Sequence, residues 1–166
     1  MDTPGIIIGL ITLFAVGGSI YVGIRSQIKP RIKVYFPNSS TQASYKAKEE
    51  ANVSIHFKNS GRRGFPKPVA RNVRLSVNTP TSFLLKELQW GGQSESYVRK
   101  ALPGGLFAGM HYLRLPPVNL NLFHGEEEAV TVLMQMPEKT GKWTIKVAIL
   151  SDEGDLGVHE LEIIVT

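Results

Sequence analysis

The stretch that decides the fold runs from Ala51 to Val77, "ANVSIHFKNSGRRGFPKPVARNVRLSV". Apolar and polar residues alternate in both of its halves, with the apolar positions at Val53, Ile55, Phe57, Val73, Leu75 and Val77. Between the halves lie asparagine, glycine and proline, which favour turns. A period of two is typical of a strand that buries one face. The stretch therefore predicts two strands joined by a basic loop.

The same period recurs outward from this stretch, while no segment has the pattern of an amphipathic helix. Clear runs lie at 31–36, 129–136, 142–150 and 159–165, and a weaker one lies at 82–89. About seven strands separated by turns predict two antiparallel sheets packed face to face, an immunoglobulin-like β-sandwich. We assign this all-β domain to residues 31–166. The stretch 90–125 is less regular, and we expect connections with one or two short strands there, such as 111–115.

The segment before the domain predicts a membrane anchor. Residues 6–24, "IIIGLITLFAVGGSIYVGI", carry no charge, and a helix of about 1.5 Å per residue crosses a hydrocarbon core of roughly 30 Å at this length. Its apolar side chains favour insertion by roughly 3 to 7 kcal/mol. We expect one transmembrane helix, between a short tail at 1–5 and a basic juxtamembrane linker at 25–30. The rival is a cleaved signal peptide, although residues 1–5 lack the basic region of such peptides.

Basic residues follow the predicted span, at Arg25, Lys29, Arg31 and Lys33. The positive-inside rule then predicts a single-pass membrane protein whose folded domain is cytoplasmic, with an extracytoplasmic domain as the alternative. Small residues four apart, Gly5 with Gly9 and Ser19 with Gly23, would allow homodimerisation through the helix. The alternative is chance, because glycine is common in such spans.

The net charge of +5 favours anionic partners. Within the loop, Arg62, Arg63 and Lys67 join the juxtamembrane residues as a candidate basic, lipid-facing surface. A solvated loop is the alternative. Nucleic acid is not an expected partner, because only Phe65 is at hand in this loop to stack on bases.

The irregular middle of the chain holds large apolar side chains among glycines. They are Trp90, Tyr97, Phe107, Met110 and Tyr112. Aromatic residues and methionine are enriched in protein interfaces, so these five form a candidate protein-binding surface. The alternative is that they cap the open end of the sandwich.

Residue types needed for chemistry are scattered or missing. The chain has no cysteine, and His56, His111, His124 and His159 lie in different runs, with His56 and His159 expected on solvent faces. The acidic run 151–157 is typical of a hairpin turn and lacks the alternation of a calcium loop. No phosphate-binding loop or nucleophile elbow occurs, and the serines have no local base partner. We therefore expect no metal, no cofactor and no enzymatic activity.

Two blocks resemble CARDB-type and related bacterial or archaeal immunoglobulin-like domains. In Ala51–Val77 a strand ends in Asn-x-Gly at Asn59 and Gly61, and a returning strand follows at Asn72, Val73, Leu75 and Val77. In His124–Val165, "HGEEEAVTVLMQMPEKTGKWTIKVAILSDEGDLG" is similar to the closing hairpin of those domains. The resemblance implies an adhesive, structural or spacer module without a shared active site. Most such domains are extracytoplasmic, which conflicts with the charge rule.

Together these observations predict a non-enzymatic, single-pass membrane-anchored module for protein–protein interaction or structural support, such as an accessory subunit of a membrane complex. The alternatives are an outward-facing adhesive domain and a membrane-tethered domain that binds anionic lipid.

Overall fold

The computed structural model describes residues 30–61, 68–101, 106–114 and 121–166. The predicted helix at 6–24 and the linker residues 25–29 lie outside these ranges. Within the ranges, no helix is long and apolar enough to cross a membrane. The anchor therefore stays a prediction.

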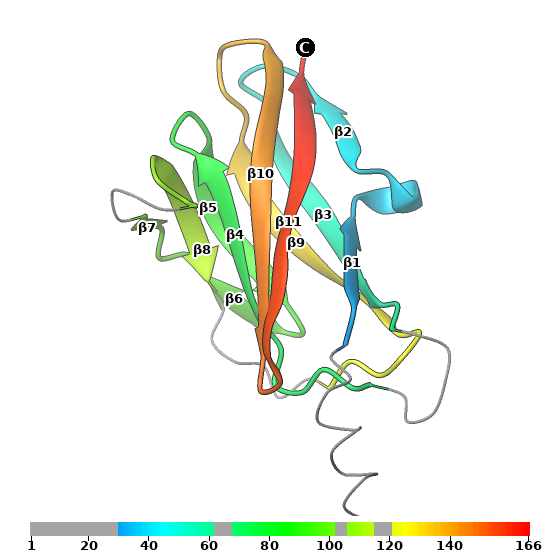
Figure 1. Ribbon diagram of the computed structural model, residues 1–166. Coiled ribbons are helices and arrows are strands. Elements are labelled where there is room, and N and C mark those ends of the chain that lie inside the picture. The colour runs from blue at the N-terminus through cyan, green and yellow to red at the C-terminus, as the bar shows by residue number, and fades with distance from the viewer. Residues whose placement is uncertain (1–29, 62–67, 102–105, 115–120) are drawn as a thin grey trace, which may run out of the picture.

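Two sheets packed face to face form a β-sandwich, which confirms the predicted all-β class (Figure 1). The five-stranded sheet has the order β1 (Ile32–Tyr35), β3 (Glu50–Asn59), β9 (Glu127–Gln135), β5 (Leu84–Trp90), β6 (Gln93–Glu95). The six-stranded sheet has the order β2 (Gln42–Tyr45), β11 (Gly154–Val165), β10 (Gly141–Ser151), β4 (Arg74–Pro80), β8 (Met110–Arg114), β7 (Arg99–Lys100). A 3-10 turn, η1, covers Pro37–Ser39.

Every run with a clear period of two forms a strand, and so does the weaker run 82–89. The expected short strand near 111–115 is β8. The sequence did not predict β2, β6 and β7, which are short, with 4, 3 and 2 residues. Their pairing comes from neighbouring strands, because so few residues carry no periodic pattern of their own.

One strand pair departs from the antiparallel prediction. The chain leaves β1, turns through η1, where Asn38 and Ser39 have φ of 63° and 58°, and changes sheet. β2 then pairs with β11 in parallel. Backbone hydrogen bonds at both ends hold the pair, from Glu162 N to Thr41 O at 2.9 Å and from Ala47 N to Thr166 O at 2.9 Å. The six-stranded sheet is therefore mixed.

The core fills the space between the two inner faces. It includes most of the apolar residues predicted from the alternation, together with others such as Ala70, Phe83, Leu85, Leu88, Trp90, Leu113 and Leu122. Trp143 is only partly buried against it. Where β3 and β5 end, the Phe57 and Trp90 rings meet edge to face, with centroids 5.1 Å apart. Phe83 and Trp143 meet in the same way at 5.9 Å. Each edge-to-face pair stabilises the fold by about 0.5–1.5 kcal/mol beyond the burial of its two rings.

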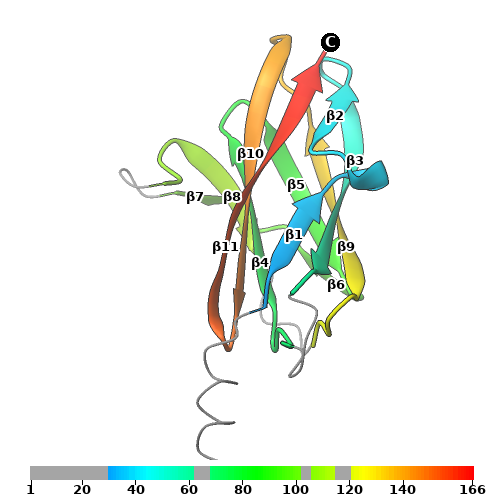
Figure 2. The same cartoon turned by 45° about the vertical axis from the view of Figure 1, so that its right-hand side comes forward.

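The sandwich has two distinct ends (Figure 2). β1 starts at one end, which also carries the β10–β11 turn and the chain around Leu122; we call it the N-terminal end. β11 finishes at the other end, beside the β9–β10 turn, so that Thr166 lies far from Pro30. Residue 30 and the last residue are thus separated by the length of the sandwich.

Candidate functional site

Trp90, one of the five residues predicted to form a protein interface, does not lie at the surface. It ends β5 on the inner face of the five-stranded sheet, is 3% exposed and packs against Phe57. A side chain that is already buried in the core offers no surface to a partner. The alternative prediction, that the residue caps the end of the sandwich, therefore describes Trp90 better.

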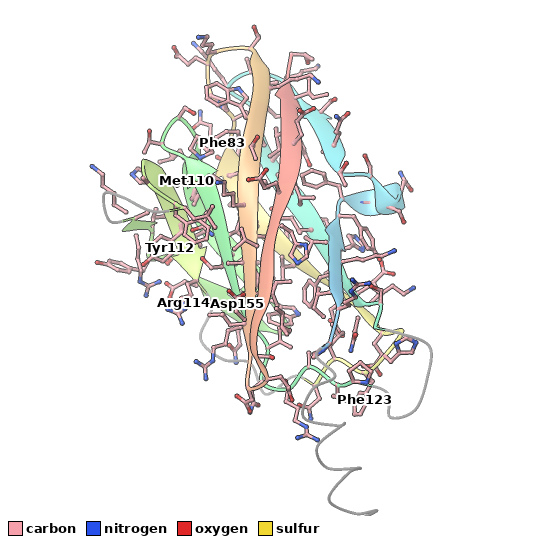
Figure 3. The ribbon with its side chains drawn as sticks, viewed as in Figure 1. Phe83, Met110, Tyr112, Arg114, Phe123 and Asp155 are labelled. Carbon is pink, nitrogen blue, oxygen red and sulfur yellow. The ribbon has the colours of Figure 1, made fainter. Side chains whose placement is uncertain are left out.

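The other four lie in the described residues on either side of 102–105. Met110 is only 7% exposed, so the prediction that it offers surface to a partner is wrong. β7 is the edge strand of the six-stranded sheet and pairs with β8, with Arg99 opposite Tyr112. Beyond the pair, Met110 N donates to Phe107 O at 3.1 Å and Ala101 N donates to Met110 O at 2.9 Å. Figure 3 shows Met110 and Tyr112 on β8. The backbone therefore brings these residues together.

A further apolar residue, Leu106, belongs to the same surface and was missed by the sequence analysis. Its side chain is 57% exposed. Lys146 Nζ, on the outer face of β10, donates to Leu106 O at 3.1 Å and ties this segment to the sheet. Tyr97 is also exposed, and its ring lies 4.9 Å from the Arg99 guanidinium carbon. We name Tyr97, Leu106, Phe107 and Tyr112 the β7–β8 patch.

The predicted basic surface is only partly described. Arg25, Lys29, Arg62, Arg63 and Lys67 lie outside the described residues. Arg31 and Lys33 are exposed at the N-terminal end, and Lys33 lies opposite Lys58 in the β1–β3 register. Glu127 lies 4.0 Å from the Lys58 ammonium and offsets part of this charge. A lipid-facing role stays a prediction.

A buried asparagine organises the base of the basic loop. Asn59 Nδ2 donates to Pro68 O at 2.9 Å and to Leu122 O at 3.0 Å, and its Oδ1 accepts from Gly61 N at 3.2 Å. A Cβ at Gly61 would lie 2.7 Å from Pro68 Cγ, so the close approach requires glycine. The Asn-x-Gly signature thus joins two loops through the hydrogen bonds of one side chain.

The histidines do not assemble into a metal centre in the part of the chain that the structure describes, where no three His, Asp or Glu residues gather. The expectation that His159 faces solvent is wrong. His159 lies opposite Val147 in the β10–β11 register and shares its inward face. Burial lowers the pKa of its imidazole, because a charged ring is disfavoured away from water.

A cluster of polar side chains lies on the outer face of the five-stranded sheet, and we name it the His56 cluster: Tyr35, Ser54, His56 and Glu127. Ser54 Oγ lies 3.3 Å from His56 Nε2, and His56 Nδ1 lies 3.0 Å from Glu127 Oε1. The Tyr35 ring stacks on the imidazole, with centroids 5.9 Å apart and an interplanar angle of 18°. The expectation that no serine has a local base partner is therefore wrong for Ser54.

The Tyr35 hydroxyl and the Glu127 carboxylate influence each other. Burial and the hydrogen bond to Glu127 raise the pKa of Tyr35 to about 12. Hydrogen bonds from Tyr35 and then from His56 hold the pKa of the Glu127 carboxyl below its usual value, because they stabilise the ionised form. At neutral pH the cluster thus contains a neutral phenol and a carboxylate.

An open groove of about 480 Å³ borders this cluster. It lies between β9, β5 and β6, and its polar lining includes Glu87, Gln89, Gln93, Ser94 and Thr131. In the β3–β9 register, Thr131 lies opposite Ser54, and Ala129, which also lines the groove, lies opposite His56. The groove therefore begins on β9, the strand next to the one that carries the serine and the histidine, and neither of those two side chains lines it.

Comparisons with known proteins show the fold alone. No family model matches the chain, and no curated protein matches it. Among solved structures, it is similar to AvmM, which catalyses macrocyclization in alchivemycin A biosynthesis, at 10% identity and a TM-score of 0.50, over 82% of this chain and 89% of that one. BslA, a bacterial hydrophobin, matches at 15% identity and a TM-score of 0.47, over 83% and 94%. The N-terminal domain of the Streptococcus gordonii adhesin Sgo0707 matches at 11% and 0.42, over 83% and 32%.

Proposed function

We propose that the protein is a single-pass membrane-anchored β-sandwich module that binds another protein through the β7–β8 patch, as an accessory subunit of a membrane complex. One observation supports this above all. Three of the five residues chosen from the sequence for their enrichment in interfaces lie at one sheet edge: Tyr97, Phe107 and Tyr112. The exposed Leu106 lies beside them. A short, free edge strand flanked by apolar side chains is a surface that a partner can cover.

The short linker supports a defined orientation. Only residues 25–29 separate the predicted span from Pro30, and an extended chain of that length reaches roughly 18 Å. The N-terminal end of the sandwich would therefore stay close to the bilayer, with Arg31 and Lys33 near the head groups. Anionic lipid would then add roughly 1 kcal/mol per basic residue to attachment. The β7–β8 patch would remain free at the side of the domain.

The same basic residues favour a cytoplasmic location for the domain. The second candidate is an outward-facing adhesive domain, which the CARDB-type resemblance supports. A topology reporter fused after Thr166 distinguishes the two. Activity on the cytoplasmic side only supports the first, and activity outside only overturns it.

Charged substitutions in residues 6–24 test the anchor. Two lysines, Leu13→Lys with Val16→Lys, are expected to release the full-length protein from membranes, because they cost about 5–7 kcal/mol at the centre of a span. Resistance to alkaline carbonate extraction is the measurement, and Leu13→Val with Val16→Leu is the apolar control. A wild-type protein that is extracted by carbonate, or whose mass shows that residues 1–24 have been removed, would contradict the anchor.

A photocrosslinker tests the patch. Leu106 and Leu84 are both 57% exposed. Leu106 lies in the turn before β8 of the six-stranded sheet, whereas Leu84 lies on β5 of the five-stranded sheet. In the intact membrane-bound protein, a crosslinking residue at Leu106 is expected to give one discrete heavier adduct, and one at Leu84 is not. Tyr112→Ala should weaken the adduct at Leu106. Equal adducts from both sites would show that the patch has no special partner.

A further inference from the structure

The His56 cluster has the arrangement of a nucleophile, a base and an orienting carboxylate. Ser54 Oγ, His56 and Glu127 follow one another at 3.3 Å and 3.0 Å, and such distances are often slightly long without substrate. We propose that Ser54 is a nucleophilic serine that cleaves small esters whose alcohol portion carries hydroxyl groups. This activity would lie on the sheet opposite the β7–β8 patch and does not rest on the proposed function.

The hydrogen bonds fix the imidazole in the tautomer that the chemistry needs. Glu127 is ionised at neutral pH and can only accept, so the proton of a neutral His56 ring must be on Nδ1. Nε2 is then left with its lone pair facing Ser54 Oγ. The serine hydroxyl therefore donates to His56, which is the direction required for removing its proton.

Three neighbouring strands hold the ring in this position. His56 lies in the interior of β3, with Tyr35 of β1 on one side and Ala129 of β9 on the other. Tyr35 acts as a positioning residue, because its ring stacks on His56 and its hydroxyl hydrogen-bonds to Glu127. The His56 side chain is 28% exposed and that of Glu127 is 40% exposed, so the pair is held but reachable.

The groove offers room and donors for a substrate. Thr131 lies opposite Ser54, and Asn52 precedes Ser54 by two residues on the same face of β3. Their hydroxyl and amide groups are the donors nearest in register for the oxygen of a bound ester carbonyl. Further along, Gln89, Gln93 and Ser94 line the groove with groups that pair with hydroxyls. This lining favours a hydroxylated alcohol portion over an acyl chain.

The reaction balances with water as the only co-substrate. Ser54 Oγ bonds to the ester carbonyl carbon while its proton passes to His56 Nε2. The carbon–oxygen bond to the alcohol then breaks, and the alcohol leaves with that proton. Water adds to the acyl-serine with His56 again taking a proton, and the carboxylic acid leaves as Ser54 regains its hydrogen.

A serine-directed fluorophosphonate tests the nucleophile in the full-length protein. We expect covalent labelling that peptide mass spectrometry places on Ser54, and turnover of p-nitrophenyl acetate. Ser54→Ala should abolish both. His56→Gln should lower the labelling rate by about 100-fold or more, because the general base is lost. Ser44→Ala, at an exposed serine of β2 in the six-stranded sheet, is the matched control and should label at the wild-type rate.

The variant Glu127→Gln distinguishes a carboxylate that orients the His56 ring from one that only stabilises the fold. An amide in place of the carboxylate should lower kcat by about 100-fold or more with KM unchanged, since the glutamine can hold the opposite tautomer. Unfolding curves that match the wild type would exclude a folding defect, as expected for a side chain on the outer face. Absence of labelling at Ser54, or labelling that His56→Gln leaves unchanged, would show that the cluster is only a surface hydrogen-bond network. Leu106→Asp should leave labelling intact, so failure of the patch and failure of this site are distinguishable.

Discussion

Replacing Phe57 with alanine is expected to lower the free energy of unfolding by about 3–5 kcal/mol. The Phe57 ring is fully buried on the inner face of β3 and meets the Trp90 ring edge to face. Alanine removes the ring and leaves a cavity that two rigid sheets cannot close by collapsing. Because domains of this size are stable by about 5–15 kcal/mol, the variant would lose a large share of its stability.

Equilibrium denaturation with urea measures this loss. Phe123→Ala is the control, since Phe123 is 51% exposed and lies at the N-terminal end (Figure 3). We expect that change to stay within about 0.5 kcal/mol. If the two variants lost similar stability, the buried Phe57 ring would not contribute more to the packing between the sheets than the exposed Phe123 ring.

The isosteric change Asn59→Asp is expected to cost about 2–6 kcal/mol, although it alters a single group of atoms. The buried amide of Asn59 donates to two carbonyl oxygens, Pro68 O and Leu122 O. An ionised carboxylate cannot donate, so both acceptors would lose their partner and face a negative charge. The loops that meet at this point would separate. The free energy of unfolding would fall although the volume of the side chain is unchanged.

The pH dependence identifies the cause. A protonated carboxyl can donate one of the two lost hydrogen bonds. Burial beside two carbonyl oxygens would raise the pKa of the new carboxyl above its unfolded-chain value of about 4, so the stability deficit should shrink as the pH falls toward about 4 and level off below it. Asn52→Asp, at an exposed position of the same strand, is the control and should change stability by less than about 0.5 kcal/mol. A deficit that does not vary with pH would show that the carboxylate charge is not what destabilises the loops.

The sequence predicted the sandwich because each long strand buries one face, and that burial appears directly as alternation. It could not predict β2, β6 and β7, since so short a strand is defined by its neighbours. It also assigned Trp90 and His159 to the wrong environments. Their burial depends on which face the register turns inward and on how deep the site lies, neither of which is contained in the local pattern.

The candidate sites differ in how far sequence could reach them. The β7–β8 patch was visible because residue composition alone suggests an interface, apart from Leu106, whose exposure depends on the loop that presents it. Ser54 and His56 share a strand face two residues apart, a spacing that could have revealed half of the His56 cluster, although we expected no base partner for any serine. Glu127 lies 71 residues from His56 and enters only through the β3–β9 register. An orienting residue of that kind requires the fold.

The separation of Pro30 from Thr166 gives the sandwich a mechanical character. Tension applied between these residues pulls β1 and β11 lengthwise, in opposite directions. The backbone hydrogen bonds from β1 to β3 and from β11 to β10 run across the strands, so this load shears them together and does not peel them one at a time. The parallel β2–β11 pair adds a third interface loaded along its length. A domain pulled in this way resists extension. The same domain pulled at a hairpin, across its strands, would lose its hydrogen bonds one after another at a lower force.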